Sequence, residues 1–410
     1  MKKLFFVLFS LFLYVATNAQ SLPPFCGSDE LERLIIEQDP SYLARKASNE
    51  AHLQRYIANH KGQERESITI PVVFHVVHSN EAIVNSITSA VLQSQIDILN
   101  RDFSRQNYDV NYLPSAFLAR SVDTEIRFCL ARQTPDGAAS TGIVRKFGSS
   151  ADAYYIMGND TDDGKSVKGS VKGSPAWDNT RYLNILICDI KDSDLADGIL
   201  GFAYRPSQIS AGATWVYGVV LDYRHTGLST VNPSTKLKVE RNMGRTLTHE
   251  VGHYLDLLHL WGSIDGENGG DDLSSDDDFC LDTPIQKNPN YGVPSFPTLS
   301  SCPGEDAFIG TMFMNYMDYP DDKVLVAFTS DQKERMHAAI NLYRPGLKTS
   351  QGCTFGTSAR GCSVLSEQLG IYAETVQNNA AVVHWVKSKS PTYEVWYKAQ
   401  SSSSWTTASG

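Results

Sequence analysis

The stretch HEVGHYLDLLH, residues 249–259, constrains the fold of this chain more than any other stretch. On an α-helix, residues four apart lie on the same face, so His249 and His253 can direct their imidazoles at one point. His259 follows His253 by six residues, too far round for a straight helix to bring it to that point. We therefore predict a helix that ends soon after His253 and a sharp turn at Asp256.

Three histidines that converge in this way are the ligand pattern of a catalytic zinc, because three protein ligands leave the fourth position open to water. Glu250 lies beside the first ligand and can take a proton from that water and pass it to a leaving amine. A helix with unrelated surface or core histidines is the plain alternative, and it leaves the shared pattern unexplained. A glutamate as third ligand is unnecessary, since His259 is suitably spaced. We expect structural roles for His75, His78, His225, His337 and His384.

Composition and the N-terminus indicate an exported globular protein. A chain of 410 residues with 41% hydrophobic content can bury a sizeable core, and its net charge of -10 argues against a nucleic-acid partner. The first residues, MKKLFFVLFSLFLYVATNAQ, have the layout of a signal peptide over 1–19, with cleavage after Ala19. The apolar run from Leu4 to Ala16 is shorter than the roughly 20 residues of a spanning helix. We predict a secreted protein with no membrane span.

The order of elements predicts an α/β domain with a mixed, mostly parallel sheet over residues 66–347, preceded by a pro-segment over 20–65. The helix that follows Ser89 places Leu92 and Ile96 at helical spacing, so one of its faces packs on the sheet. The predicted strands are 68–78, 124–131, 181–190, 201–206 and 214–224. After a disulfide loop and linker over 348–365, alternating strands over 366–410 resemble the start of a fibronectin type III β-sandwich.

Seven cysteines meet an oxidising environment, and an odd number leaves at least one of them unpaired. Cys280 with Cys302, and Cys353 with Cys362, are close enough in sequence to close short loops. Cys129 and Cys188 lie in apolar runs, where a buried thiol and a disulfide are equally open.

The zinc motif and three further stretches carry a resemblance to the metzincin zinc peptidases, and within them to the pappalysin family. NYMDY (315–319) resembles the family's Met-turn, CLDTP (280–284) its disulfide-closed calcium segment, and WDNTRYLNI (177–185) is similar to another family stretch. The resemblance covers roughly residues 65–347 and implies a metzincin-like catalytic domain and a zinc endopeptidase that acts on proteins and peptides. It also implies that Met317 forms a hydrophobic floor under the metal and that Tyr319 helps to hold the oxyanion.

The resemblance and the charge pattern lead to two further expectations. The segment 265–284 holds seven aspartates and one glutamate, which repel one another unless cations neutralise them. We therefore expect structural Ca²⁺, with Asp278, Asp282 and Thr283 as candidate ligands. Bacterial relatives in the family favour a basic residue just after the scissile bond, so Asp321 and Asp322 are candidate specificity residues. Lys323 beside them could neutralise that charge.

Cys26 is a candidate switch for latency. A thiolate is a strong zinc ligand that can occupy the fourth position, and Cys26 lies in the pro-segment before Gly27. The CG pair resembles the cysteine switch of the family, with release by cleavage between Arg55 and Arg65. The alternative is a disulfide from Cys26 to Cys129 or Cys188.

The family's turn usually carries glycine where this chain has Asp256, and aspartate is among the residues that tolerate positive φ best. We expect activity to survive this difference. A different class of function, an adhesion or binding protein with a vestigial metal site, is disfavoured because Glu250 is intact.

Overall fold

The computed structural model describes residues 26–147, 154–155, 174–190, 198–206, 218–231, 239–262, 278–299 and 310–355, and four short strands between residues 372 and 408. The predicted leader over 1–19 and most of the acidic segment before Asp278 lie outside these residues. No helix in the described part of the chain is long and apolar enough to cross a bilayer.

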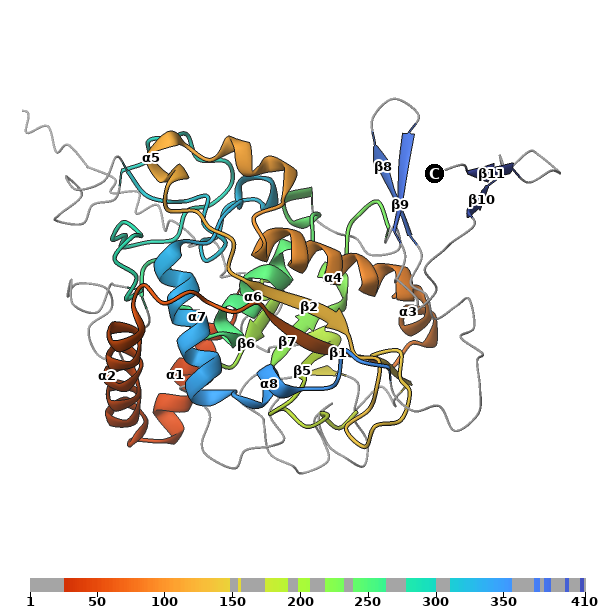
Figure 1. Ribbon diagram of the computed structural model, residues 1–410, viewed down its shortest axis with the longest axis horizontal. Helices are drawn as coiled ribbons and strands as arrows, with labels where there is room; N and C mark the ends of the chain where they lie inside the picture. Colours follow the sequence, from red (N-terminus) through yellow and green to blue (C-terminus); the bar gives the residue numbers. More distant parts are fainter. Residues whose placement is uncertain are drawn as a thin grey trace, which may run out of the picture.

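A seven-stranded sheet forms the centre of the molecule (Figure 1). Its strands are β1 (Ile68–His78), β2 (Ile126–Leu130), β3 (Ile143–Phe147), β4 (Tyr154–Tyr155), β5 (Leu183–Ile190), β6 (Gly201–Ala203) and β7 (Val219–Asp222). The hydrogen-bonded order is β2-β1-β5-β7-β6, with β3 paired to β1 and β4 to β5. Every pair is parallel except β6 with β7. The prediction of a mostly parallel sheet is therefore confirmed.

The predicted strands agree with the structure best where β-branched residues are densest. β1 occupies all of 68–78, and its side chains alternate between two faces, as the period of a strand requires. Val72 and Phe74 enter the largest core cluster, whereas Val77 enters a second cluster on the other face. β6 ends at Ala203 and is shorter than the predicted 201–206. This short strand is also the edge of the sheet, beside the candidate site.

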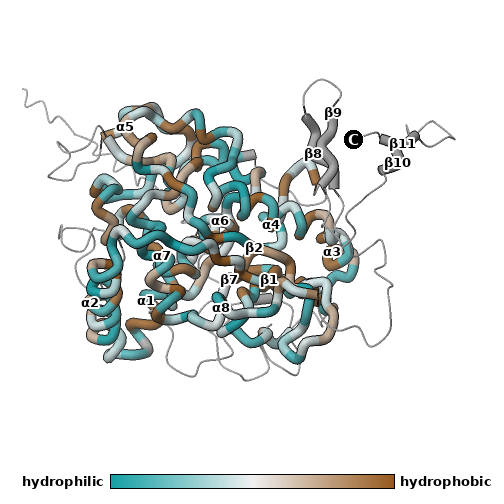
Figure 2. Tube along the Cα trace, in the orientation of Figure 1, coloured by the Kyte–Doolittle hydropathy of each residue, from teal (hydrophilic) through white to brown (hydrophobic). Residues whose placement is uncertain are grey.

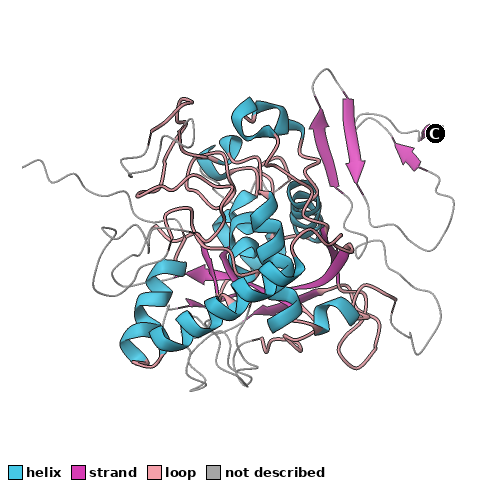
Figure 3. Cartoon of the chain, turned by 60° about the vertical axis from the view of Figure 1, so that its left-hand side comes forward, coloured by secondary structure: helices cyan, strands magenta, loops and turns pink. Residues whose placement is uncertain are grey.

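Helices cover the sheet and supply the candidate site (Figures 1 and 3). They are α1 (Ser28–Gln38), α2 (Tyr42–His60), α3 (Glu81–Ser86), α4 (Ser89–Phe103), α5 (Ser115–Leu118), α6 (Arg245–Tyr254), α7 (Ser330–Tyr343) and α8 (Gly346–Thr349). Short 3-10 turns are η1 (Tyr108–Tyr112), η3 (Tyr223–His225), η4 (Val239–Arg241) and η6 (Asp322–Val324). Thr88 caps α4 by accepting a hydrogen bond from the Val91 amide, and α4 packs on α6 and β2.

Of the predicted pro-segment over 20–65, the structure describes residues 26–65, which include α1, α2 and the exposed residues 61–64. Leu31 of α1 is buried in the second core cluster against Phe202 and Tyr204, on the face of the sheet opposite α4 and α6. Helix α2 packs against α7, and only Tyr42 and Leu53 along it are buried. Its hydrophilic surface contrasts with the hydrophobic strands at the centre (Figure 2). The pro-segment therefore packs onto the domain through a few apolar residues and through buried polar contacts.

The disulfide prediction for Cys353 is wrong. Cys353 bonds to Cys129 at the end of β2, with their Cα atoms 6.0 Å apart and a sequence separation of 224. Helix α8 returns the chain to β1, and the Arg132 amide donates to the Gly352 carbonyl, which brings the two cysteines together. Residues 348–355 therefore belong to the packed domain, and Cys362, the predicted partner, lies outside the described residues.

The C-terminal strands form two hairpins. β8 (Tyr372–Val376) pairs with β9 (Ala380–His384), and β10 (Val395–Tyr397) pairs with β11 (Thr406–Ala408), both antiparallel. The sequence predicts strands here, but within the described residues the pairs remain separate two-stranded sheets. The partial β-sandwich is not confirmed.

Candidate metal centre

Helix α6 carries the first two histidines and is buried along its whole length. It begins after Gly244, whose φ of 74° lies in the left-handed region that glycine adopts readily. The carboxylate of Asp322 accepts hydrogen bonds from the Met243 and Arg245 amides at 2.9 and 3.3 Å, which satisfies amides at the start of the helix. A buried carboxylate therefore holds the start of the helix that carries His249 and His253.

The chain turns where the spacing predicts. Helix α6 ends at Tyr254, and Asp256 has φ 75° and is buried. The turn returns His259 to the helix. The Nε2 atom of His249 lies 3.1 Å from that of His253 and 3.2 Å from that of His259. The remaining pair, His253 and His259, is 3.0 Å apart. The three imidazoles thus point at one centre.

A hydrogen bond to the other ring nitrogen orients each imidazole. The Nδ1 atom of His249 lies 2.7 Å from the Tyr316 carbonyl, and that of His253 lies 2.8 Å from the Leu257 carbonyl. The Nδ1 atom of His259 lies 3.0 Å from the Asp29 carboxylate. These acceptors select the tautomer that leaves Nε2 free to bind a metal.

The donor set fits a zinc ion. Burial lowers the pKa of His249 and His253 well below the usual value, and neutral imidazole is the form that binds metals. The three nitrogens are 3.0–3.2 Å apart, close to the separation of about 3.4 Å between ligands that each lie about 2.1 Å from one tetrahedral ion. Their outer partners are a carbonyl or carboxylate, as is usual for histidines that bind zinc.

The predicted Met-turn, residues 315–319, forms a floor and one wall of the site. Met317 is fully buried and lies against Gly252 on α6. The hydroxyl of Tyr319 lies 3.0 Å from Nε2 of His259. Burial raises the pKa of Tyr319 well above the usual value, so its hydroxyl keeps its proton. The predicted Met-turn residues therefore lie at the histidine cluster.

Glu250 and Cys26 meet beside the histidines. The Glu250 side chain is buried, and its Oε2 atom accepts a hydrogen bond from the Cys26 thiol at 3.5 Å. Burial raises the pKa of both groups well above their usual values. A dication at the centre would favour their anionic forms instead.

Cys26 belongs to the metal-binding group of atoms. One ligand atom from each of Cys26 and the three histidines lies within 4.8 Å of all the others. The alternative disulfides of Cys26 are excluded, because Cys129 is bonded to Cys353 and the Cys26 thiol lies at Glu250. Gly27 donates from its amide to the Gly201 carbonyl at 2.9 Å, so the pro-segment runs along the edge strand β6.

The chain is similar to known proteins in both sequence and structure. Residues 167–341 match a family model described as Pregnancy-associated plasma protein-A, the M43 peptidases. A mirolysin structure is 38% identical and covers 69% of this chain and 97% of its own, with a TM-score of 0.58. This chain belongs to the pappalysin family. It is a zinc metalloendopeptidase, and the domain that carries the site has the metzincin fold.

Further relatives agree with this assignment. A promirolysin variant from Tannerella forsythia is 35% identical and covers 79% of this chain and 97% of its own, with a TM-score of 0.65. An extracellular metalloprotease of Colletotrichum graminicola is 28% identical over 68% of this chain and 78% of its own length. One from Pyricularia oryzae is 25% identical over 78% and 90%. The named curated relatives of this pappalysin are extracellular proteases.

Other predicted site residues of this pappalysin have clear contacts. Asp278 accepts hydrogen bonds from the Cys280 amide and the Thr283 hydroxyl. Asp282 accepts from the Thr329 hydroxyl and the Asp331 amide at the start of α7. Their role as calcium ligands stays a prediction. The predicted disulfide of Cys280 is not confirmed, because Cys280 is a buried free thiol in the structure. Its predicted partner, Cys302, lies outside the described residues.

The two aspartates after the Met-turn differ in environment. Asp322 is buried at the start of α6, with a guanidinium nitrogen of Arg241 3.8 Å away. Asp321 is nearer the surface, and Lys323 lies 3.8 Å from its carboxylate. A cation therefore lies near each carboxylate: Arg241 near Asp322, and Lys323 near Asp321, as the sequence led us to expect.

Sequence reasoning missed three polar residues that shape the pappalysin site. Asp29 reaches His259 from the pro-segment. Asp318 accepts from the Tyr319 amide and from side chains of the 286–290 loop. Arg335 of α7 contacts the turn at Asp256. Asp318 could have been found from the sequence, because it lies inside the NYMDY stretch. Asp29 and Arg335 could not, because their partners lie far away in the sequence.

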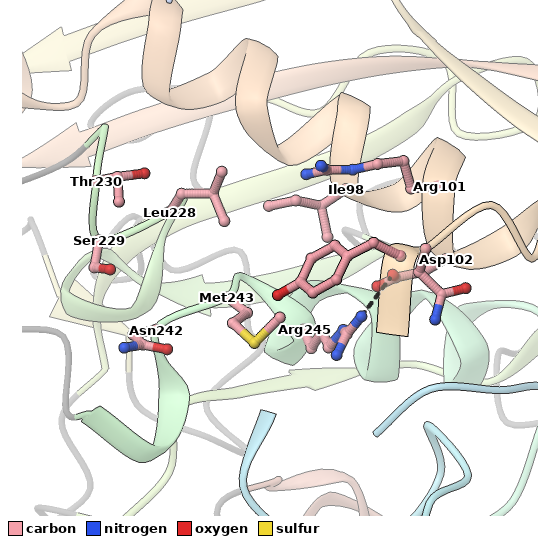
Figure 4. A pocket seen from close by; sticks show the side chains of 11 residues that line it. Ile98, Arg101, Asp102, Leu228, Ser229, Thr230, Asn242, Met243 and Arg245 are labelled. Carbon is pink, nitrogen blue, oxygen red and sulfur yellow. Dashed lines mark hydrogen bonds and ion pairs between the residues drawn. The ribbon is translucent and has the colours of Figure 1, made fainter. Parts of the chain in front are cut away.

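A cavity of about 170 Å³ lies between α4 and the start of α6 (Figure 4). Ile98 and Asp102 line it from α4, and Met243 and Arg245 line it from the other side. The Arg245 guanidinium lies 3.4 Å from the Asp102 carboxylate within it. None of the three histidines lines this cavity, so it is separate from the metal centre.

The contact between Gly252 and Met317 allows a test of the floor. A Cβ atom at Gly252 would overlap the Met317 sulfur, so Gly252→Ala must displace the Met-turn or the helix. We expect a loss of about 1–3 kcal/mol in the free energy of unfolding, as for other overpacked cores, and reduced zinc content. Denaturant titration and metal analysis measure both. The double variant G252A/M317A should lose less than the sum of its parts, and simple additivity would show that the two residues do not collide.

Proposed function

We propose that this chain is made as a secreted, latent precursor and that it hydrolyses peptide bonds within proteins once residues 20–65 are removed. The observation that carries this proposal is the convergence of three buried, oriented imidazoles with Nε2 atoms 3.0–3.2 Å apart. His249, His253 and His259 would hold Zn²⁺. When bound, the ion supplies an acidified water and polarises the substrate carbonyl.

The neighbouring side chains have complementary tasks in this proposal. The Glu250 carboxylate takes the proton of the attacking water and delivers it to the leaving amine. The Tyr319 hydroxyl donates a hydrogen bond to the oxygen on which negative charge builds. Met317 closes the site from below with an apolar surface and excludes water there. All three residues are buried at the histidines.

The alternative of a binding protein with a vestigial site has less support. Decay of a site removes its base, its ligands or the partners that orient them, since none is then needed. Here Glu250 and the three histidines are present, and the rings keep their carbonyl or carboxylate partners. A maintained donor set supports an active peptidase.

Glu250→Ala tests the mechanism. The variant should keep its fold and its zinc, because Glu250 is not a proposed ligand, and should lose activity by about 10²-fold or more through loss of the base. The pro-segment is removed by an added protease, since the variant cannot process itself. Zinc content and peptide hydrolysis are then measured. His249→Ala, His253→Ala and His259→Ala serve as the contrast, because each should lose zinc. Undiminished activity in Glu250→Ala would rule out this base.

Latency would rest on Cys26 as the fourth ligand. Its thiol lies within 4.8 Å of a ligand nitrogen of each histidine and hydrogen-bonds Glu250, which supports a thiolate that would exclude the attacking water from the metal. The exposed residues 61–64 lie between α2 and β1, where cleavage would free the pro-segment. The greater share of this chain matched by promirolysin than by mature mirolysin from Tannerella forsythia, 79% against 70%, supports a precursor form.

Cys26→Ala should yield a precursor that cleaves substrate or processes itself early, because water can then reach the metal. Fresh precursor is assayed over time by peptide hydrolysis and by gel. Cys188→Ala is the matched control, since Cys188 is another buried cysteine but lies on β5 in the second core cluster. If the Cys26→Ala precursor stays as latent as the control, a contact other than Cys26 keeps the precursor inactive.

A preference for Arg or Lys after the scissile bond is the proposed specificity. Asp321 is the better candidate for recognition, because Asp322 is buried at the start of α6. A peptide library should be enriched in basic residues at that position, and Asp321→Asn should weaken the enrichment. Enrichment of apolar residues would reject the proposal.

Structural calcium is proposed for the acidic segment 265–284. Each carboxylate oxygen of Asp282 accepts one hydrogen bond, from the Thr329 hydroxyl and from the Asp331 amide, and so keeps a lone pair for a cation.

A further inference from the structure

The turn that delivers the third histidine has an unusual residue and an unusual partner. Asp256 has φ 75°, a conformation that costs most residues free energy, and its side chain is buried. Arg335 of α7 is also buried and donates twice to this residue. Its Nε atom donates to the Asp256 carbonyl at 2.7 Å, and Nη2 donates to the carboxylate at 3.1 Å. The arginine therefore holds both the backbone and the side chain of the turn.

A second carboxylate reaches the same arginine from the pro-segment. Glu50 of α2 accepts from Nη1 and Nη2 of Arg335 at 2.7 and 2.8 Å, a bidentate pair. Burial raises the pKa of Glu50, but the charge of Arg335 and its hydrogen bonds more than offset this, and the pKa is lowered. One buried cation thus serves two carboxylates, one in the metal-site turn and one that leaves with the pro-segment.

The turn is connected directly to the histidines. The Asp256 amide donates to the His253 carbonyl at 2.8 Å, and the next carbonyl, that of Leu257, lies 2.8 Å from Nδ1 of His253. Two residues further on, the chain reaches His259. A shift of the Asp256 backbone would therefore move the partner of one ligand and the position of another.

We propose that Arg335 is a positioning residue for the metal centre. This arginine holds the turn at Asp256, and its charge is balanced by two carboxylates, that of Asp256 and that of Glu50 in the pro-segment. This rests on the proposed function, since the readout is the zinc site. In the precursor either carboxylate can balance the buried guanidinium. After the pro-segment leaves, Asp256 is the remaining member of the pair, which accounts for an aspartate at a position where the backbone alone would favour glycine.

The proposal predicts a distinct pattern in the full-length precursor. Asp256→Gly keeps the backbone conformation and leaves Arg335 paired with Glu50, so zinc affinity should change by no more than about twofold. Glu50→Gln leaves Arg335 paired with Asp256, with the same small effect. The double variant E50Q/D256G strands a buried cation and should weaken zinc binding by about tenfold or more, well beyond the product of the single effects.

Arg335→Met should also weaken zinc binding by about tenfold or more, because the turn then loses the donors to both the carbonyl and the buried carboxylate of Asp256. Adding Asp256→Gly to it removes that carboxylate and relieves the backbone. R335M/D256G should therefore bind zinc more tightly than Arg335→Met alone, a gain that no general loss of packing predicts. This second variant keeps the test valid if Arg335→Met folds poorly.

Competition with a chromophoric zinc chelator measures affinity, and thermal unfolding monitors the fold. Glu334→Gln is the matched control, because Glu334 also lies on α7 and pairs with Arg65 at the end of the pro-segment. It should lower stability without changing zinc affinity. If the wild-type chain binds no zinc, the proposed function fails. If wild type binds zinc and E50Q/D256G and Arg335→Met bind it equally well, only the role of Arg335 is rejected.

Discussion

The reversal of the chain at Asp256 is the constraint on which the rest of the site depends. Two ligands on one helix define a direction but not a closed site, and the third must come from the segment that follows. The helix therefore stops at Tyr254, and a backbone with positive φ returns His259 to within 3.0 Å of His253. A turn of this kind is not stable by itself. Arg335 of α7 holds the turn through hydrogen bonds to Asp256, and the Met-turn packs against the preceding helix at Gly252.

Much of this arrangement could be predicted from local pattern. The period of β1, the apolar face of α4 and the spacing of the histidines each depend on residues close in sequence, and each prediction agrees with the structure. Even the position of the turn followed from His259, because a straight helix could not deliver it. Local periodicity is reliable where burial on one face is strong.

The contacts that we could not predict from the sequence join residues that are far apart along the chain. The link from Cys129 to Cys353 spans 224 residues, and nothing near either cysteine distinguishes it from the shorter loop to Cys362. Arg335 meets Glu50 across 285 residues for the same reason. Asp322 is a candidate specificity residue from its place after the Met-turn, whereas in the structure its carboxylate accepts hydrogen bonds from the amides at the start of α6. Such contacts follow from topology, which a single sequence does not display.

The pro-segment does more than block the metal position, because it also completes the surroundings of one ligand. His249 and His253 have carbonyl partners within the catalytic domain, but the Nδ1 partner of His259 is Asp29 of the pro-segment. Burial raises the pKa of Asp29, yet the nearby His259 and its hydrogen bond lower it overall, so the carboxylate is anionic. An anionic partner makes an imidazole a stronger donor to a metal. In the proposed activation, departure of the segment would remove the fourth ligand, a partner of the third ligand and one of the carboxylates on Arg335 in one event. Latency and the order of the metal site would then be coupled through the same few buried contacts, which lie on both sides of the turn.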